Sequence, residues 1–363
     1  MTEKSTEIFR SDAGGSLEQQ CREILDKAGD GRKILSVTYF IDAEDDSVYL
    51  EKDAILRAET LSRFIPEEAP LVNCASQKPL CGNGLAAEIL FINEYASVTR
   101  RSDYLVIESE GGRELLTQGL HSPSGGDTGE QSAGIFRRAG EILAAEGFVP
   151  SDIVRQWNYI DHITAVSGGV QNYQMFNDAR SAFYGGADWS GGYPAATGIG
   201  CSAGGLMVVM YAVKAPGIVS RPIDNPLQIP AHRYSQKVLV QGKENARTTP
   251  KFERARILED VVFVSGTAAI KGERSELSDN AAVQAEEAVD VVNHLVAPAN
   301  IAAGCKSFRF RMLRVYVRRP EDAETVKKVF SARFTGVPIH FLNADICRPE
   351  LLLELEGIGK AGF

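Results

Sequence analysis

The same order of predicted elements occurs twice along the chain, and this repeat limits the fold more than any other feature. In each half a helix is followed by a strand, a second helix and two closing strands. Two helices packed on one face of a mixed sheet, built twice, is an α+β architecture. Identity between the halves is low, so the order of elements is what indicates an internal duplication. The two sets are 130–146, 153–160, 173–184, 195–200 and 206–213, then 279–295, 308–318, 323–334, 339–346 and 351–355.

The other segments indicate two domains, with a lead-in segment before the first domain and a connecting segment between the two. Residues 1–32 hold a Gly-Gly-Ser turn and a short helical pattern, and we expect a loosely attached lead-in. Residues 216–230 carry four of the fifteen prolines, which is typical of an inter-domain connection. The predicted domains are therefore 33–215 and 231–363. Further elements are expected as strands at 34–42, 86–95, 103–109 and 255–264, and as a short helix at 54–64.

A carboxylate lies inside the last predicted strand. Leu351–Leu355 is apolar except for Glu354, and strand periodicity places Glu354 and Glu356 on one face. A carboxylate in such a run must be paired, exposed at a sheet edge, or held in a pocket with a raised pKa. An edge strand with both carboxylates facing water is the simplest interpretation. A pocket would make Glu354 a candidate proton donor, with Glu356 as an ion-paired neighbour.

Composition excludes several classes of protein. Hydrophobic residues make up 44% of the chain and charged residues 24%, which is ordinary for a globular protein. The net charge of −9 argues against a nucleic-acid or anionic-membrane surface. No apolar run reaches the roughly 18 residues that a membrane span needs, and the N-terminus shows no hydrophobic signal core. We therefore expect a cytoplasmic protein.

Cofactor and metal chemistry find no support in the sequence. The six cysteines are scattered without a CxxC pair, which favours free thiols in a reducing compartment. His, Asp and Glu do not cluster at metal-ligand spacing, and no glycine fingerprint precedes an acidic residue as in dinucleotide-binding folds. We expect neither a metal nor an organic cofactor. The turn Ser265–Ala268 lacks the surroundings of a nucleophilic serine and is interpreted as a pocket-lining turn.

Several motifs, in a fixed order, resemble those of the chorismatases. Asp345-Ile-Cys-Arg348 followed by Leu351-Leu-Leu-Glu-Leu-Glu-Gly357 resembles the C-terminal signature of that family. Each motif is weak alone, but their ordered run is specific and covers roughly 153–357. The other motifs are Trp157–Ile160, Tyr173–Arg180, Ala196–Gly200, Asn225–Gln228 and Val264–Ala268.

The resemblance implies both a fold and a reaction. Chorismatases consist of two tandem domains, each like a subunit of the reactive-intermediate deaminases. They cleave the enolpyruvyl ether of chorismate without a cofactor and release pyruvate. The family resemblance makes Glu354 the acid that protonates the enol ether. Cys347 resembles the branch that forms hydroxybenzoate, and its thiol could exchange protons near neutral pH. We therefore expect 3-hydroxybenzoate as the main product.

An anionic substrate requires arginines, because guanidinium groups pair with carboxylates through two hydrogen bonds. Tyrosines would bind its hydroxyl or carboxylate groups. The sequence departs from the family pattern at His232, where tyrosine is usual, and at 238–246, which looks like an insertion. The expected substrate-binding residues are Tyr173, Arg180, Gly200, Tyr234, Thr267, Ala268, Arg318 and Arg348.

Two other functions stay open at this point. The chain could be a deaminase-like or ligand-binding homologue that kept the fold without the reaction. It could also be a chorismatase of the type that uses water and forms a dihydroxy-cyclohexadiene carboxylate, since that branch favours alanine near Ala268 and Ala269. A monomer and a homo-oligomer are both compatible with the sequence.

Overall fold

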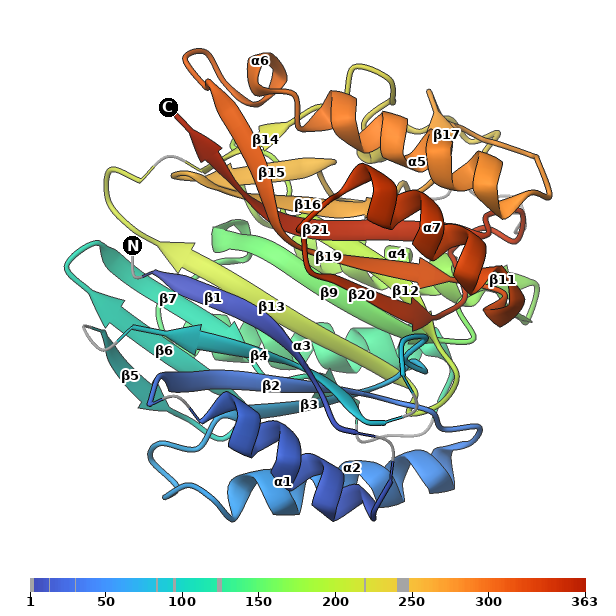
Figure 1. Cartoon of the computed structure of the whole chain (residues 1–363). Helices are drawn as coiled ribbons and strands as arrows, with labels where there is room; N and C mark the ends of the chain where they lie inside the picture. The colour runs from blue at the N-terminus through green and yellow to red at the C-terminus, as the bar shows by residue number, and fades with distance from the viewer. Residues whose placement is uncertain are drawn as a thin grey trace.

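The computed structural model describes residues 3–12, 14–29, 31–82, 84–93, 96–122, 126–218, 220–239 and 248–363. Three mixed sheets lie at the centre of the molecule, and helices cover them on the outside (Figure 1). In this view α1 and α2 lie at the bottom and α5 at the top. The inner faces of the three sheets therefore meet one another.

The first sheet has the strand order β1-β4-β2-β3, with bounds Lys4–Arg10, Ala86–Ile92, Lys33–Ile41 and Leu71–Ser76. Helices α1 (Leu17–Ala28) and α2 (Asp46–Leu61) pack against it. The expectation of a loosely attached lead-in is wrong, because β1 pairs with β4 along its whole length and α1 buries Cys21 and Ile24. Helix α2 begins earlier than 54 because the Asp45 side chain accepts hydrogen bonds from the first-turn amides.

The second sheet has the order β12-β9-β13-β7-β6-β5, and β8 (Leu120–His121) also pairs with β13. Helices α3 (Thr128–Ala145) and α4 (Asn172–Tyr184) cover one face of it. A short hairpin, β10 (Val166–Ser167) and β11 (Val170–Gln171), leads into α4. The sheet strands are Ala195–Cys201, Ile153–Asp161, Leu206–Lys214, Gly112–Thr117, Tyr104–Ser109 and Ser97–Arg100.

The third sheet has the order β14-β15-β16-β21-β19-β20, covered by α5 (Ala281–Leu295) and α7 (Ala323–Arg333). The predicted strand at 255–264 is two strands, because Glu259 turns the chain with a φ of 56°. Strand β14 lies within the predicted connection. The strands are Ser220–Ile223, Ala255–Leu258, Val261–Thr267, Leu353–Gly362, Ser307–Val317 and Ile339–Asn343; the smaller elements are α6 (Pro298–Ile301), β17 (Ile270–Lys271) and β18 (Arg274–Ser275).

All three sheets share one local plan. Each has a central strand that pairs in parallel with one neighbour and antiparallel with the next, as β9 does with β12 and β13. The same arrangement relates β2 to β3 and β4, and β19 to β20 and β21. The predicted α+β fold with tandem modules is confirmed, and the structure adds a further module of the same plan at residues 4–92. The proposed boundaries at 33, 215 and 231 stay a prediction.

A buried ion network joins the three sheets at the centre. Arg314 on β19 donates from Nε to both oxygens of Glu88 on β4 at 2.8 Å, and from Nη1 to Glu356 on β21 at 2.7 Å. Arg155 on β9 pairs with the other oxygen of Glu356. His340 on β20 contacts Glu88 through Nδ1 at 2.9 Å. Removing one member of such a buried ion pair is costly, because it leaves the other charge buried without a partner.

Removing one charge from this network should destabilise the protein. Glu88→Gln leaves the buried Arg314 short of a counter-charge, and we expect a loss of about 3–5 kcal/mol in the free energy of unfolding. Chemical denaturation of the wild type and the variant measures this difference in the free energy of unfolding. Glu7→Gln is the matched control, because Glu7 on β1 also pairs with an arginine, Arg32, but both side chains are half-exposed. The control should lose less than about 1 kcal/mol. Equal losses would contradict this account of the centre.

Candidate active site

A small cavity lies between the second and third sheets. Helix α4 and strand β12 form one side of it, and β16, β21 and the loop after β20 form the other. Its volume is about 60 Å³. Pockets that bind small molecules usually measure roughly 300–1,000 Å³, so this cavity has to widen to hold a substrate. The lining residues that concern the chemistry are Tyr173, Asn177, Arg180, Tyr234, Arg254, Gly266, Ala268, Cys347, Arg348 and Glu354.

Glu354 projects from β21 into this cavity and is only 5% exposed. Its carboxyl lies against Gly266, where an added Cβ would come within 2.0 Å of Oε1, so no larger residue fits at 266 without a shift. Burial raises the pKa of Glu354 to about 8, and the negative charge of Glu356 contributes to the rise. Within the described residues no side chain holds the carboxyl by a hydrogen bond. Glu354 is thus a protonated acid at neutral pH.

Glu356 has the opposite environment, although it lies only two residues away on the same face of β21. Arg155 and Thr197 bind one carboxylate oxygen, while Arg314 (2.7 Å) and the Tyr316 hydroxyl (2.9 Å) bind the other. Burial alone would raise the pKa of Glu356, but the two guanidinium groups lower it. Neither carboxylate faces water, so the edge-strand interpretation is wrong. Glu356 is a fixed negative charge beside an uncharged acid.

Two buried arginines line the cavity, and within the described part of the chain neither forms an ion pair. Arg180 on α4 donates from Nη2 to Asn177 at 2.6 Å, and its buried Nε has no partner. Arg254 donates from Nη2 to the Ile229 carbonyl at 2.7 Å and to the Tyr234 hydroxyl, and its Nε is also unsatisfied. Two uncompensated guanidinium groups in one cavity favour a ligand with two anionic groups.

Arg254 was not among the residues expected from the sequence. It immediately precedes β15 and belongs to none of the motifs quoted above. Two features of the structure identify Arg254: its Nε has no hydrogen-bond partner, and its positive charge lowers the pKa of Glu354. The alternation of charged and apolar residues in 254–257 would have placed Arg254 and Arg256 on one face, but it could not distinguish between them. Arg256 is satisfied by Ser220 and by the carbonyls of 191–193.

The structure brings seven of the predicted site residues to the cavity: Glu354, Cys347, Tyr173, Arg180, Tyr234, Ala268 and Arg348. Arg348 is anchored by hydrogen bonds of 3.0 Å to the Glu273 carbonyl and to Ser275, and its guanidinium lies 5.4 Å from the Tyr234 ring. Burial and the charge of Glu354 raise the pKa of Cys347 to about 12. The expectation that this thiol exchanges protons near neutral pH is therefore not supported, because it stays a neutral thiol.

Gly200, Thr267 and Arg318 lie outside the cavity lining. The Gly200 amide donates to the Asp345 carbonyl at 2.8 Å, and an added Cβ would meet that oxygen. The Thr267 hydroxyl donates to the Ser265 carbonyl at 2.9 Å. Arg318 pairs with Asp345 at 2.7 Å and donates to the carbonyls of Ile346 and Arg348. These residues support the loop 345–348 and the turn at Gly266.

Residues 240–246 of the expected insertion fall outside the described part of the chain, while Val238 and Leu239 line the cavity. The His232 Nδ1 lies 3.9 Å from a carboxylate oxygen of Glu253, and the imidazole ring packs against the ring of Tyr193. His232 does not line the cavity. Among the described residues, no three His, Cys, Asp or Glu side chains gather as metal ligands. Nor does any helix there have the length and apolarity to cross a membrane.

Known proteins are similar to this chain in sequence and in fold. A family model described as chorismatase FkbO/Hyg5-like, N-terminal, matches residues 92–212. A chorismatase of Streptomyces rapamycinicus is 30% identical over 65% of this chain and 72% of its own length. This chain belongs to the chorismatase family. A 3-hydroxybenzoate synthase of Streptomyces hygroscopicus is 32% identical, and the match spans 60% of this chain and 66% of that protein.

Solved structures agree on the fold of this chorismatase family member. A chorismatase crystal structure aligns over 98% of both chains with a TM-score of 0.73 and 22% sequence identity. Because the alignment covers nearly the whole chain, it includes the first sheet as well as the two sheets that form the cavity.

Proposed function

We propose that this chain cleaves the enolpyruvyl ether of chorismate and releases pyruvate, with Glu354 as the acid. The observation that carries the proposal is the buried carboxyl of Glu354, with no hydrogen bond to a described side chain, in the same cavity as two guanidinium groups that form no ion pair within the described residues. Chorismate carries two carboxylates and an enol ether, which matches these three groups. The names of the relatives, chorismatase and 3-hydroxybenzoate synthase, support the same substrate.

The positions of Glu354 and Arg254 in the cavity suggest how the ether is cleaved. Glu354 donates its proton to the terminal methylene carbon of the enol ether, and the π electrons form the new C–H bond. This leaves an oxocarbenium ion and a Glu354 carboxylate in a cavity of low polarity, where Arg254 stabilises the new negative charge. A hydroxyl oxygen then adds to the cation and gives up its proton, which returns to the Glu354 carboxylate. If the hydroxyl is water, the product is a hemiketal, which passes its hydroxyl proton to the ring oxygen and collapses to pyruvate and the dihydroxy-cyclohexadiene carboxylate. If it is the ring hydroxyl, the product is a cyclic ketal: the ether-bearing ring carbon loses its proton, the C–O bond at the neighbouring ring carbon breaks and its oxygen takes up a proton, and the hemiketal so formed collapses to 3-hydroxybenzoate and pyruvate. Acid catalysis of this kind needs a pKa near the working pH, which burial supplies here.

Pyruvate release tests the proposal. Purified protein is incubated with chorismate, and pyruvate is followed through NADH consumption by lactate dehydrogenase. A ligand-binding homologue without activity is the alternative, and calorimetry separates the two cases. Saturable binding of chorismate without pyruvate would favour the alternative, whereas turnover that disappears in Glu354→Gln supports the proposal.

The rate should depend on pH through Glu354. Because the pKa is raised to about 8, Glu354 keeps its proton at neutral pH and loses it above about pH 8. We expect kcat/KM for pyruvate release to be flat from pH 6 to 7.5 and to fall about tenfold per pH unit well above 8. The carboxyl groups of chorismate titrate far below this range. A decline centred near pH 4.5 would show that burial does not set this pKa.

The attacking hydroxyl decides the product, and we infer that the ring hydroxyl attacks, giving 3-hydroxybenzoate after rearomatisation. The name of one relative, 3-hydroxybenzoate synthase, supports this product, and Cys347 lines the cavity in which the ring would lie. Cys347→Val adds bulk, and we expect it to displace the ring and admit water at the cation. Chromatography should then show more dihydroxy-cyclohexadiene carboxylate than the wild type gives. Cys305→Val, at a distant half-buried cysteine, should leave the product ratio unchanged.

A further inference from the structure

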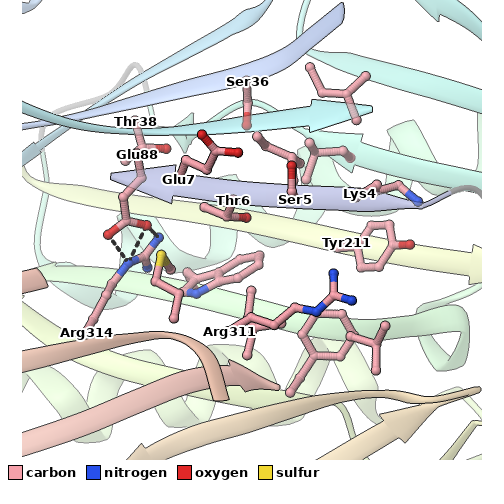
Figure 2. A pocket seen from close by; sticks show the side chains of 18 of the residues that line it. Lys4, Ser5, Thr6, Glu7, Ser36, Thr38, Glu88, Tyr211, Arg311 and Arg314 are labelled. Atoms are coloured by element: carbon pink, nitrogen blue, oxygen red, sulfur yellow. Dashed lines mark hydrogen bonds and ion pairs between the residues drawn. The ribbon is translucent and has the colours of Figure 1, made fainter. Parts of the chain in front are cut away.

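A second, much larger cavity lies at the centre of the molecule. Its volume is about 1,010 Å³, and no residue that lines it also lines the reaction cavity. All three sheets contribute to its walls, among them β1 and β4 of the first, β9 and β13 of the second, and β19 and β21 of the third. Glu88 and Arg314 close one end, where their ion pair is visible in Figure 2. The proposed reaction uses none of this space.

One wall of the central cavity is apolar and partly aromatic. Trp157 lies in the middle of β9, yet it is only half-buried, because part of its ring faces the cavity. Phe263, Val209 and Leu90 continue the wall. Interiors are normally packed to high density, so a cavity of this size beside a half-buried indole is unusual unless something enters it. Ligand pockets combine such walls with a few polar groups.

The charged groups around the cavity are mostly paired with one another. Lys4 pairs with Glu114, Asp260 with Lys360 at 2.8 Å, and Glu7 with Arg32. Arg311 is held more weakly: its ion-pair partner Glu3 lies 3.8 Å away and has a side chain that is 70% exposed. Figure 2 shows the Arg311 guanidinium reaching into the cavity near Tyr211. This group is therefore placed to receive an anion.

We propose that the central cavity is a second ligand site, which binds a small molecule with a flat apolar body and one anionic group. The body lies against Trp157 and Phe263, and the anionic group pairs with Arg311. Stacking on an indole is favourable, and a guanidinium forms charge-assisted hydrogen bonds to an anion even where, as at Arg311, the side chain is 43% exposed. This site is separate from the site of the proposed reaction, and its test measures binding and not turnover.

Two dyes of similar shape test the proposal. Anilinonaphthalene sulfonate is a flat anion, and phenylnaphthylamine is its uncharged counterpart. The chain has two tryptophans, so Trp189→Phe leaves Trp157 as the single tryptophan whose quenching reports on the cavity. In this background we expect saturable binding of both dyes with quenching of Trp157. Arg311→Ala should weaken binding of the anionic dye at least about tenfold and leave the neutral dye unchanged. Arg309→Ala, an exposed arginine on the same strand, is the matched control.

Substitutions that fill one cavity or the other show which of the two cavities binds the dye. Val209→Phe narrows the central cavity and should abolish quenching, whereas Ala268→Phe fills the reaction cavity and should leave quenching intact. Circular dichroism and the melting temperature establish that both variants are folded, and Leu90→Phe replaces Val209→Phe if the latter is not. Loss of binding in Ala268→Phe with retention in Val209→Phe would overturn the proposal. So would equal weakening of both dyes by Arg311→Ala, or the absence of saturable binding.

Discussion

Replacing Glu354 with glutamine should lower the rate of pyruvate release from chorismate by about 10²–10⁴-fold or more. The amide has nearly the same volume, so it should fit against Gly266, but it has no acidic proton to give to the methylene carbon. The carboxyl makes no hydrogen bond to a described side chain, and the fold should therefore tolerate the change. Steady-state kinetics with the coupled assay measure the loss.

The same substitution at Glu350 is the control for Glu354→Gln. Glu350 lies on the loop just before β21 and does not line the cavity. Glu350→Gln should keep the wild-type rate, and both variants should melt within a few degrees of the wild type. Near-full activity in Glu354→Gln would remove Glu354 from its role as acid. A collapse of both activity and melting temperature would instead indicate a structural role.

Arg254→Ala should have the second-largest effect. If Arg254 pairs with a substrate carboxylate inside the cavity, its removal leaves that carboxylate buried without a partner. Truncating one member of a buried charge pair costs about 2–5 kcal/mol, which corresponds to a loss of roughly 30-fold to 10³-fold or more in kcat/KM. Most of the loss should appear in KM, because the carboxylate is charged in the ground state as well as in the transition state.

A second measurement separates this role of Arg254 from a loss of structure. The positive charge of Arg254 lowers the pKa of Glu354, so its removal should raise that pKa and move the high-pH decline of kcat/KM to higher pH. A variant that is merely misfolded would not show this shift. Arg233→Ala changes an exposed arginine beside Tyr234 and should alter neither KM nor the pH profile. Unchanged KM in Arg254→Ala would show that other groups bind the carboxylates.

The sequence by itself determined the order of elements in the two repeated halves and the face of the acid strand that carries both glutamates. Alternation in β21 places Glu354 and Glu356 on one face, because strand geometry repeats every two residues. Helical spacing places Tyr173 and Arg180 on one face of α4, and both line the cavity. These are local regularities of the backbone. They could therefore be predicted without knowing any long-range contact.

Only the tertiary structure decided which charged groups form ion pairs with one another and which can bind a ligand. Glu356 is neutralised by Arg155, 201 residues away, and Arg314 by Glu88, 226 residues away. Local periodicity gives the face of a strand but not the partner across the interface. For the same reason Arg254 was missed, Gly200, Thr267 and Arg318 were placed in the site, and β1 and α1 were taken for a loose lead-in. The pKa of Glu354 depends on these distant contacts, because burial and neighbouring charge fix it and both arise when three sheets pack together.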